Sequence, residues 1–570
     1  MDDFSVAETT QGFRVKLWRG ERMCLLGMDV NQPEADLVGF SIEVMEPGGR
    51  NFVPLNNRLN FSYDQPAGAA VTGGRLFSSL EAPFQKFRWI HFPWDVKNGT
   101  YRYRVTKMHM SLDGKLVQGR QIELGLSLDP VTYDGFLDVG FTRNFASSQA
   151  FAEKFGDRPE LIPDKASTGL EYQKANGGVY QWLGFEALQL LEDLLEAAIA
   201  YPSCTVDLLA YDLNEPDIVA RLERLGGRLR AVIDNSGEHG KHDSAESKAA
   251  ARLAVTAGGM QVKRTHFQGL QHHKVIVVKR NGKPEQVLFG STNFSFRGLY
   301  IQANNLIVVR APEAAALFAQ IFEEAFGDPG YFAANPLAQQ WHLIKVDGKP
   351  ALHFCFSPHQ SSALSLNPVG AAIDQASSSV LYSVAFLNMI DSGPTREALD
   401  RLIGRPVFSY GVVNNDAGLA VRKPDGSVGL VDFAYLAGKA PQPFRREWSG
   451  GQGINIHHKF IVTDFSLASA KVFTGSSNLA PSGESGNGDN LMMIEDSKVA
   501  SAYAIEALRM FDHLHFRTLM KETFAPAAPQ LAPKSLSLKK PTAISGEPAW
   551  FESSYVPGSQ KEKDRRLFSS

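Results

Sequence analysis

The strongest constraint on this chain is a stretch of 34 residues that occurs twice without a gap. The first copy runs from His272 to Asn305 and the second from His457 to Asn490. The residues that recur at a constant offset of 185 positions include His272, Lys274, Gly290, Ser291, Asn293 and Asn305. Such a repeat indicates duplication of one supersecondary unit. Two copies favour a pair of related halves over a solenoid, which needs at least three repeats.

Length and composition predict a globular protein of several domains. The 570 residues exceed one ordinary core, and about 150 residues per domain gives three or four domains. Hydrophobic residues make up 44% of the chain and charged residues 21%, as in soluble globular proteins. The formal net charge of -3 provides no overall attraction to nucleic acid, although a local basic groove is compatible with it.

Cysteines and hydropathy restrict the environment of the chain. Cys24, Cys204 and Cys355 lie far apart, which indicates buried apolar side chains instead of a disulfide framework or a metal centre. The N-terminus shows no basic region followed by an apolar run, and no window approaches 18 apolar residues. We therefore expect a cytoplasmic protein without a secretory signal or a transmembrane segment.

The N-terminal region, residues 1–150, is predicted to be an antiparallel β-sandwich. Apolar and polar residues alternate in several runs, and turn sequences such as Pro-Gly-Gly and Asn-Gly separate these runs. Strands are expected at 13–18, 39–46, 100–110 and 121–128.

Beyond residue 178 the pattern changes to alternating helices and strands, which predicts an α/β fold. Helices are expected at 177–200, 215–226 and 244–258, and strands at 204–213 and 228–234. A strand, a helix and a strand in short succession imply a parallel pair with a right-handed crossover. His239 and His242 lie in the polar loop 234–243, where we expect solvated side chains.

The second half repeats this order. Strands are expected at 351–358, 378–387 and 406–414, and helices at 370–377, 394–404 and 502–514. The predicted domains are therefore 1–150, a first lobe at 178–335, a second lobe at 345–520 and an extended tail at 524–570. The long insertion 416–456, which contains Trp448, is a candidate lid or substrate loop. Aromatic residues near the chain end, Trp550, Phe551 and Tyr555, predict that the tail docks back on the protein.

Each copy of the repeat begins with His-His-Lys in a strand-like run. Side chains alternate along a strand, so His272 and Lys274 share one face and His273 points away. The same alternation pairs His457 with Lys459 in the second copy. A Gly-Ser-x-Asn turn follows each lysine, and its glycine lets backbone approach a ligand. We therefore expect an imidazole, an ammonium, a hydroxyl and a carboxamide to converge in each half, and both sets to meet in one cleft.

These side chains favour phosphodiester chemistry. A metal site is disfavoured, because lysine is a poor ligand at neutral pH and each half offers one well-placed histidine. Two lysines and two asparagines suit the oxygens of a phosphate as charge builds up on them. One histidine attacks phosphorus, while the other protonates the leaving oxygen and later activates water. The expected reaction is metal-independent and cofactor-free, through a phosphohistidine.

The paired motifs, H-x-K followed by G-S-x-N, resemble those of the phospholipase D superfamily over roughly residues 178–520. The resemblance implies two pseudo-twofold-related α/β/α lobes with one shared active site. The positions that match catalytic residues of the family are His272, Lys274, Asn293, His457, Lys459 and Asn478. Supporting roles are implied for Ser291, Ser476, Asp464 and Asp489.

The resemblance also implies roles within these sets. His272 is expected to be the nucleophile and His457 the acid. The family has an aspartate five residues after the lysine, which Asp464 matches, whereas the first copy has Lys279 there. That aspartate supports local structure in the family, so this departure is compatible with activity.

Asn304 of the first copy corresponds to Asp489 of the second. An amide or a carboxylate at this position is suited to orient a catalytic imidazole through its Nδ1 atom. A turn or a helix cap explains the two residues equally well.

We expect hydrolysis of phospholipid head groups, with nuclease activity, phosphatidyl transfer and an inactive scaffold as alternatives. A lipid substrate predicts an aromatic rim in peripheral contact with a membrane, with candidates at 178–185 and Trp448, although core packing also explains these aromatics. A nucleic-acid substrate requires a basic track, for which the candidates are Lys263, Arg264, Arg280 and Arg297.

Overall fold

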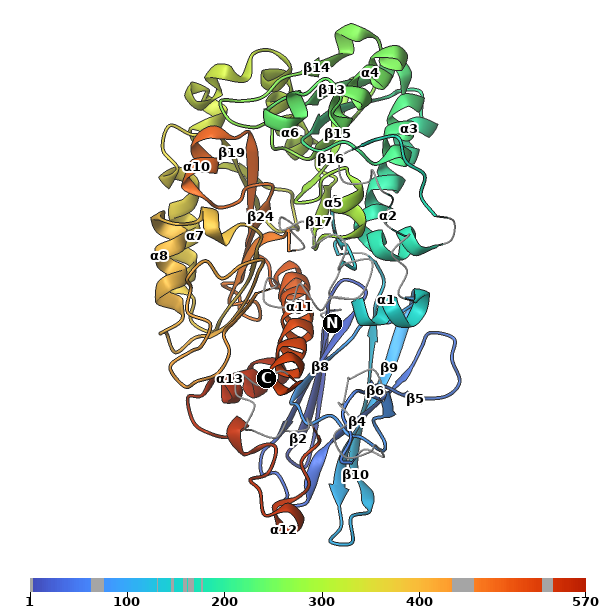
Figure 1. Cartoon of the computed structure of the whole chain (residues 1–570), viewed down its shortest axis with the longest axis vertical. Coiled ribbons are helices and arrows are strands. Elements are labelled where there is room, and N and C mark those ends of the chain that lie inside the picture. Colours follow the sequence, from blue (N-terminus) through green and yellow to red (C-terminus); the bar gives the residue numbers. More distant parts are fainter. Residues whose placement is uncertain are drawn as a thin grey trace. The chain divides into compact units, whose positions relative to one another are not determined.

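Two kinds of sheet organise the chain: purely antiparallel sheets in one unit and mixed sheets in the other (Figure 1). The computed structural model describes residues 4–62, 76–130, 132–144, 148–156, 161, 163, 169–175, 178–432, 456–524 and 537–570. Unit 1 consists of Met1–Pro130, Arg422–Val428 and Phe511–Ser570, and unit 2 of Val131–Val421 and Gly429–Met510. The predicted α/β class is confirmed in its general form, because the chain combines helices with several sheets.

Unit 1 contains two four-stranded antiparallel sheets, ordered β1-β2-β3-β8 and β10-β9-β4-β5. The first consists of β1 (Ser5–Thr10), β2 (Phe13–Arg19), β3 (Cys24–Val30) and β8 (Arg88–His91). The second consists of β4 (Leu37–Met45), β5 (Val53–Pro54), β9 (Thr100–Met110) and β10 (Leu116–Ser127). The short strands β6 (Asn56–Asn57) and β7 (Phe77–Ser78) form a separate pair. All four strands predicted here are confirmed as strands.

Alternation explains the core of unit 1. Phe13, Val15 and Leu17 of β2 are fully buried, and they share one hydrophobic cluster with Phe40 of β4 and Tyr101 of β9. A period of two places every second residue on the same sheet face, so one apolar face of each sheet supplies this core.

The C-terminal region differs from the extended tail predicted for 524–570. Its described part contains α12 (Thr542–Ser545), the 3₁₀ helix η10 (Glu552–Ser554) and α13 (Gln560–Ser569). Ser559 caps α13 by accepting a hydrogen bond from the Glu562 amide, and Phe568 is fully buried. Trp550 stacks on Phe87 and donates to the Leu37 carbonyl at 3.0 Å, so the predicted docking of the aromatic end is confirmed within unit 1.

Unit 2 holds both copies of the repeat in two mixed sheets. Their orders are β11-β17-β16-β15-β12-β13-β14 and β18-β19-β25-β24-β23-β20-β21-β22. The first comprises β11 (Leu137–Phe141), β12 (Cys204–Ala210), β13 (Leu229–Ile233), β14 (Val262–Arg264), β15 (Val275–Arg280), β16 (Lys283–Gly290) and β17 (Asn305–Val309). The second comprises β18 (His342–Ile344), β19 (Leu352–Ser357), β20 (Ser379–Val384), β21 (Phe408–Val413), β22 (Leu430–Asp432), β23 (Lys459–Thr463), β24 (Lys471–Gly475) and β25 (Asp489–Ile494).

Seven strands follow the same order in both sheets, from β11 to β14 in the first and from β19 to β22 in the second. In the first, β12 pairs parallel with β13 and antiparallel with β15; in the second, β20 pairs parallel with β21 and antiparallel with β23. Helix α3 (Pro216–Arg224) connects the first parallel pair, and α8 (Gly393–Leu402) connects the second. The strand–helix–strand crossovers predicted from the sequence are therefore present in both halves.

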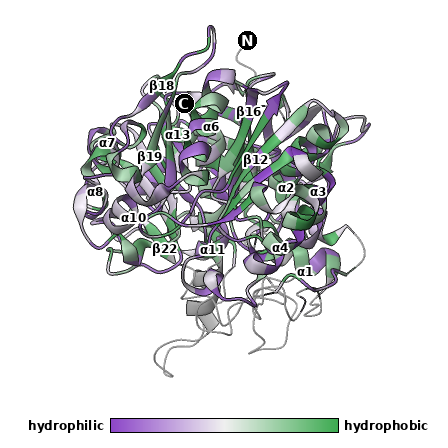
Figure 2. Cartoon of the chain, turned by 90° about the horizontal axis from the view of Figure 1, so that it is seen from above, coloured by the Kyte–Doolittle hydropathy of each residue, from purple (hydrophilic) through white to green (hydrophobic). Residues whose placement is uncertain are grey.

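Helices cover these sheets. They are α1 (Ser148–Phe155), α2 (Val179–Ala200), α4 (Ala245–Ala257), α5 (Phe296–Tyr300), α6 (Pro312–Phe326), α7 (Ala363–Gln375) and α10 (Pro481–Gly486). Helix α11 (Ser497–Phe524) contributes residues to both units. Figure 2 shows strands β12 and β16 in hydrophobic colours, with α2 beside β12 and α6 beside β16. These strands are thus buried beside helices, and polar residues that could form a site lie at the strand ends.

Candidate active site

The two copies of the repeat contact each other through backbone at their catalytic histidine candidates. The His272 amide donates to the Gly488 carbonyl at 2.9 Å, and the His457 amide donates to the Ala303 carbonyl at 3.1 Å. The start of each copy therefore lies against the end of the other. The structure thus brings the two predicted sets of side chains together in unit 2.

Each histidine is held by a residue of the other copy. His272 Nδ1 lies 2.7 Å from Asp489 Oδ1, and His457 Nδ1 lies 2.8 Å from Asn304 Oδ1. A carboxylate accepts only, and the Asn304 amide nitrogen donates to the Gly298 carbonyl at 2.9 Å. Both imidazoles therefore carry their proton on Nδ1 when neutral and leave Nε2 for chemistry. For Asn304 and Asp489 we considered two roles, orientation of an imidazole and a turn or helix cap. The contacts fit orientation of the imidazole.

The motif serines lie behind the histidines. Ser476 Oγ donates to Asp489 Oδ1 at 2.6 Å, and Ser291 Oγ donates to Asn304 Oδ1 at 2.8 Å. Both serines are completely buried. Their hydroxyls therefore hold the residues that orient the imidazoles. This differs from the expectation that the hydroxyls converge with the other groups on the substrate.

The two lysines are buried and share the site with the histidines. Lys459 Nζ donates to the His457 carbonyl at 2.9 Å and lies 3.2 Å from His457 Nε2, while Lys274 Nζ donates to the His272 carbonyl. Both are completely buried, and neither forms an ion pair with a carboxylate among the described residues. Burial lowers the pKa of Lys274 to about 8. Burial and the charge of Lys274 together lower the pKa of Lys459 well below its usual range.

Burial also lowers the pKa of both histidines. For His272 the Asp489 carboxylate opposes this effect, whereas for His457 the charge of Lys459 adds to it, so its pKa falls well below the usual value. His272 therefore has the group that stabilises an imidazolium, and His457 does not. An anion bound between the lysines compensates their charge and raises the pKa values of the lysines and of His457.

The motif asparagines differ in their contacts. Asn293 Nδ2 donates to Asp212 Oδ2 at 2.6 Å. Asn478 is buried, and its Oδ1 has no hydrogen-bond partner within the described ranges. Both amides lie beside the Gly-Ser turns, where Gly290 and Gly475 have φ values of 155° and 154°. A Cβ at either glycine would lie 2.3 Å from a carbonyl oxygen of the next strand, which explains the need for glycine.

The second histidine of each copy points away from the site, as strand alternation predicts. His273 contacts the Asn490 amide at 3.2 Å, and His458 Nε2 lies 3.2 Å from Glu506. Both rings are fully buried, and burial lowers the pKa of His273 to about 3. These two histidines therefore belong to the core.

Asp464 and Lys279 occupy corresponding positions with different partners. Asp464 accepts hydrogen bonds from the backbone amides of 377–379, the turn before β20. Lys279 pairs with Asp207 on β12. Each residue ties its strand to the neighbouring strand, away from the histidines.

Sequence analysis missed several groups at the end of β12. The Tyr211 ring lies 4.8 Å from the His272 ring and 4.5 Å from the His239 ring. His239 was expected to be solvated, yet its Nε2 lies 3.0 Å from Asp212 and its Nδ1 lies 2.8 Å from Asp234. The signal was available, because residues that follow the carboxyl ends of strands commonly line sites in α/β sheets.

The aromatic rim candidates are only partly described. Tyr180 and Trp182, in the segment 178–185, are buried, which supports the alternative of core packing. Trp448 lies outside the described residues. Among helices in the described part of the chain, none has the length and apolar character needed to cross a bilayer.

The basic track candidates have local partners. Lys263 donates to the Phe326 carbonyl, and Arg264 donates to the Asp234 and His239 carbonyls. Arg280 pairs with Glu285 at 2.9 Å. These three side chains therefore support the fold, and Arg297 alone of the four lines a cavity beside the site.

Comparison with known structures gives distant similarities. Polyphosphate kinase from Porphyromonas gingivalis is 10% identical with a TM-score of 0.38; the match covers 62% of this chain and 51% of the kinase, so the chain spans about half the length of that protein. The phospholipase D family member Nuc from Salmonella typhimurium is 23% identical with a TM-score of 0.19, covering 24% of this chain and 86% of Nuc. Phosphatidylserine synthase from Haemophilus influenzae is 11% identical with a TM-score of 0.41, covering 58% of this chain and 85% of the synthase.

The sequence was also compared with curated proteins and with models of protein families. No curated protein matches the chain. Residues 195–326 match the family model described as the PLD-like domain of cardiolipin synthase, and this stretch contains the whole first copy of the repeat. The match confirms, for residues 195–326, the resemblance to the phospholipase D superfamily that the motifs indicated.

Proposed function

We propose that the chain is a metal-independent phosphodiester hydrolase that forms a phosphohistidine intermediate and cleaves the head groups of phospholipids. One observation carries the proposal. Two buried lysines without carboxylate partners lie beside two histidines, and each histidine is oriented through Nδ1 by the other copy of the repeat. Burial disfavours the charged form of both lysines, and an anion such as a phosphodiester bound beside them favours that form.

The contacts support different roles for the two histidines. His272 Nε2 attacks phosphorus and forms a P–N bond, while the bond from phosphorus to the leaving oxygen breaks. Asp489 stabilises the positive charge that develops on the His272 ring. His457 gives its Nε2 proton to the leaving oxygen, then takes a proton from water, which attacks phosphorus and releases His272. Lys274, Lys459, Asn293 and Asn478 stabilise the charged phosphate oxygens.

The choice of a lipid substrate is supported by the basic residues. Three of the four candidates for a nucleic-acid track are engaged in local contacts. Transfer of the phosphatidyl group to an alcohol uses the same residues and differs only in the acceptor. A lipid substrate requires peripheral contact with a membrane, and we propose a cytoplasmic location for the enzyme.

The proposal also concerns the domain architecture of the chain. We infer that the two sheets of unit 2 belong to pseudo-twofold-related lobes, 178–335 with β11 added and 345–520 with β18 added. We also infer that, of the predicted domain 1–150, the antiparallel sheets before residue 131 form a β-sandwich. The common order of seven strands in the two sheets supports the relation of the lobes. The shared core of the two antiparallel sheets supports the sandwich.

The test is choline release from phosphatidylcholine in mixed micelles by the purified chain in excess EDTA. His272→Ala and His457→Ala serve as controls, and a single-stranded DNA oligonucleotide is the parallel substrate. We expect choline release that both substitutions abolish. Cleavage of DNA alone would change the substrate class to nucleic acid. Activity that survives either substitution, or that requires added metal, would contradict the phosphohistidine mechanism.

A further inference from the structure

A second cluster of ionisable groups lies beside the candidate active site, on the other side of the Tyr211 ring. It consists of Asp212 after β12, His239 in the 3₁₀ helix η4 (Gly237–Gly240), Glu246 in the first turn of α4, and Asp234 after β13. The Tyr211 ring separates His239 from His272. The proposed hydrolysis uses none of these four side chains.

Three of these residues present donor atoms to one point. His239 Nε2 lies 3.0 Å from Asp212 Oδ1 and 4.0 Å from Glu246 Oε1, and the three donor atoms lie within 4.8 Å of one another. Ligands at about 2.1 Å from a tetrahedral zinc ion are about 3.4 Å apart, which is within this spacing. One imidazole and two carboxylates are also the donor types of open zinc sites.

Asp234 supplies the hydrogen-bond acceptor that metal-binding histidines usually have on their other ring nitrogen. Asp234 Oδ2 lies 2.8 Å from His239 Nδ1, and the Asp234 side chain is fully buried. A carboxylate on Nδ1 orients the ring, and Nε2, which donates to Asp212 when no ion is bound, gives up its proton when a metal binds there. The His239 backbone is also held, because its carbonyl accepts hydrogen bonds from Arg264 and Ser244. The donor atoms are therefore held in place before an ion arrives.

The charges of the cluster favour a cation. Three carboxylates surround one imidazole, and among the described residues the only ion pairs of Asp212, Asp234 and Glu246 are with His239. The Glu246 side chain is 7% exposed.

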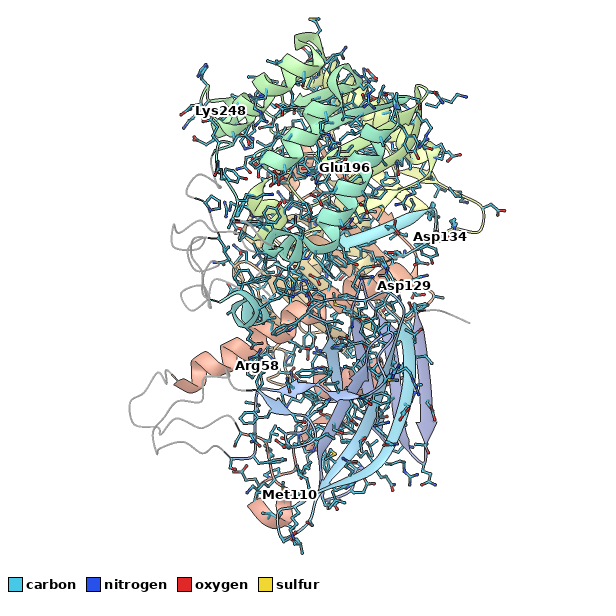
Figure 3. All side chains as sticks on the ribbon, turned by 90° about the vertical axis from the view of Figure 1, so that its right-hand side faces the viewer. Arg58, Met110, Asp129, Asp134, Glu196 and Lys248 are labelled. Carbon is cyan, nitrogen blue, oxygen red and sulfur yellow. The ribbon has the colours of Figure 1, made fainter. Side chains whose placement is uncertain are left out.

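The cluster is accessible and touches the candidate site. Asp212, His239 and Glu246 line a cavity of about 530 Å³, together with Arg297 and with Lys248, which Figure 3 labels on α4. Asp212 uses its other oxygen to accept from Asn293, whose Oδ1 is buried and has no hydrogen-bond partner within the described ranges. An ion can thus enter through the cavity, and Asp212 connects it to a motif asparagine.

From this geometry we propose that Asp212, His239 and Glu246 bind one divalent transition-metal ion of the Zn²⁺ class, with Asp234 orienting His239. The ion fixes Asp212 and through it the Asn293 carboxamide. It takes no part in the transfer of the phosphoryl group, so this site is additional to the proposed hydrolysis and does not depend on it.

The test is isothermal titration calorimetry of ZnCl₂ into the full-length chain after treatment with EDTA and removal of the chelator. We expect one ion per chain. His239→Ala and Glu246→Gln should weaken binding by about 100-fold or more, because each removes one of three ligands. His242→Ala is the matched control, since His242 is an exposed histidine three residues along the same loop, and it should bind as the unmodified chain does.

Circular dichroism and thermal melting without metal establish that the variants are folded. Zinc should raise the melting temperature of the unmodified chain and of His242→Ala, and should leave that of folded His239→Ala unchanged. Failure of the unmodified chain to bind, or equal binding by folded His239→Ala, would overturn the proposal. Hydrolysis is measured separately in EDTA, so loss of one proposal leaves the other standing.

Discussion

The two copies of the repeat carry the same motif residues but surround them differently. In the first copy, His272 is bonded to a carboxylate, Asp489; in the second, His457 is bonded to an uncharged amide, Asn304. A carboxylate stabilises an imidazolium, and an amide only fixes the tautomer. The two half-sites are therefore similar but not equivalent, and in the proposed mechanism the residue at this position distinguishes the nucleophile from the acid.

The difference extends to the strands around the histidines. The strand β12 is followed by Tyr211 and Asp212, whereas β20 is followed by Ala385 and Phe386. Asp234 accepts from the Gln271 amide at 2.8 Å, and Asn414 accepts at 3.4 Å from the amide at 456, the position equivalent to 271. The first half therefore has the carboxylates of Asp212 and Asp234 where the second half has the uncharged residues Phe386 and Asn414.

The largest expected effect separates the two histidines by their chemical roles. His272→Ala and His457→Ala should each lose about 10³-fold or more in steady-state hydrolysis of phosphatidylcholine, because one removes the nucleophile and the other the proton donor. With phosphatidyl p-nitrophenol, whose leaving group needs no acid, His457→Ala should release a burst of one equivalent of nitrophenol and then stop. His272→Ala should give no burst. A burst from His272→Ala would reverse the assignment.

The next effect concerns the residues that orient the histidines. Asp489→Asn keeps a hydrogen-bond acceptor but removes the charge that stabilises the His272 imidazolium, so kcat/KM should fall about 10²-fold or more. Asn304→Asp adds a charge beside His457 and should change kcat/KM less than tenfold at neutral pH, because it only favours the protonated acid. Steady-state kinetics of both variants, with melting temperatures as the control for folding, check this asymmetry. Equal losses in the two variants would contradict it.

A smaller effect appears in the pH profile of kcat/KM, which reports groups of the free enzyme. Because the pKa of Lys274 is lowered to about 8, the lysine is charged below that pH and neutral above it. Binding of the anionic substrate should therefore weaken as pH rises above about 8. On the acidic side, the lowered pKa of His272 keeps the nucleophile neutral below its usual value of 6.5. A profile that keeps rising to pH 10 would exclude Lys274 as a charged phosphate ligand.

The smallest effect on activity is expected at the two positions five residues after the lysines. Asp464→Ala leaves three backbone amides without their acceptor and should lower the free energy of unfolding by about 2 kcal/mol or more. Lys279→Ala leaves Asp207 paired with Arg230, so about 1 kcal/mol or less is expected. Urea denaturation measures both values. A large fall in kcat of a folded variant would give these positions a direct role in the reaction.

Much of this organisation could be predicted from the sequence, because the motif spacing and the strand periods are local properties. The offset of 185 residues identified the two histidine–lysine pairs, and alternation placed His273 and His458 in the core. The serines were wrongly expected to face the substrate. Each one is hydrogen-bonded to a residue 13 positions later, Asn304 or Asp489, and that contact depends on how the neighbouring strands pair. His239 was missed because two of its carboxylate partners, Asp212 and Glu246, lie outside the loop that carries it. The helix α13 was missed because its cap and its buried Phe568 depend on packing within unit 1.

The central claim is that His272, supported by Asp489, carries the phosphoryl group. The most direct test is a rapid alkaline quench of His457→Ala after mixing with phosphatidyl p-nitrophenol, followed by proteolysis and mass spectrometry of the peptides that contain the two motifs. The account predicts a phosphatidyl adduct on His272 and an unmodified peptide at residue 457. An adduct on any other residue, or nitrophenol release with His272 unmodified, would contradict it.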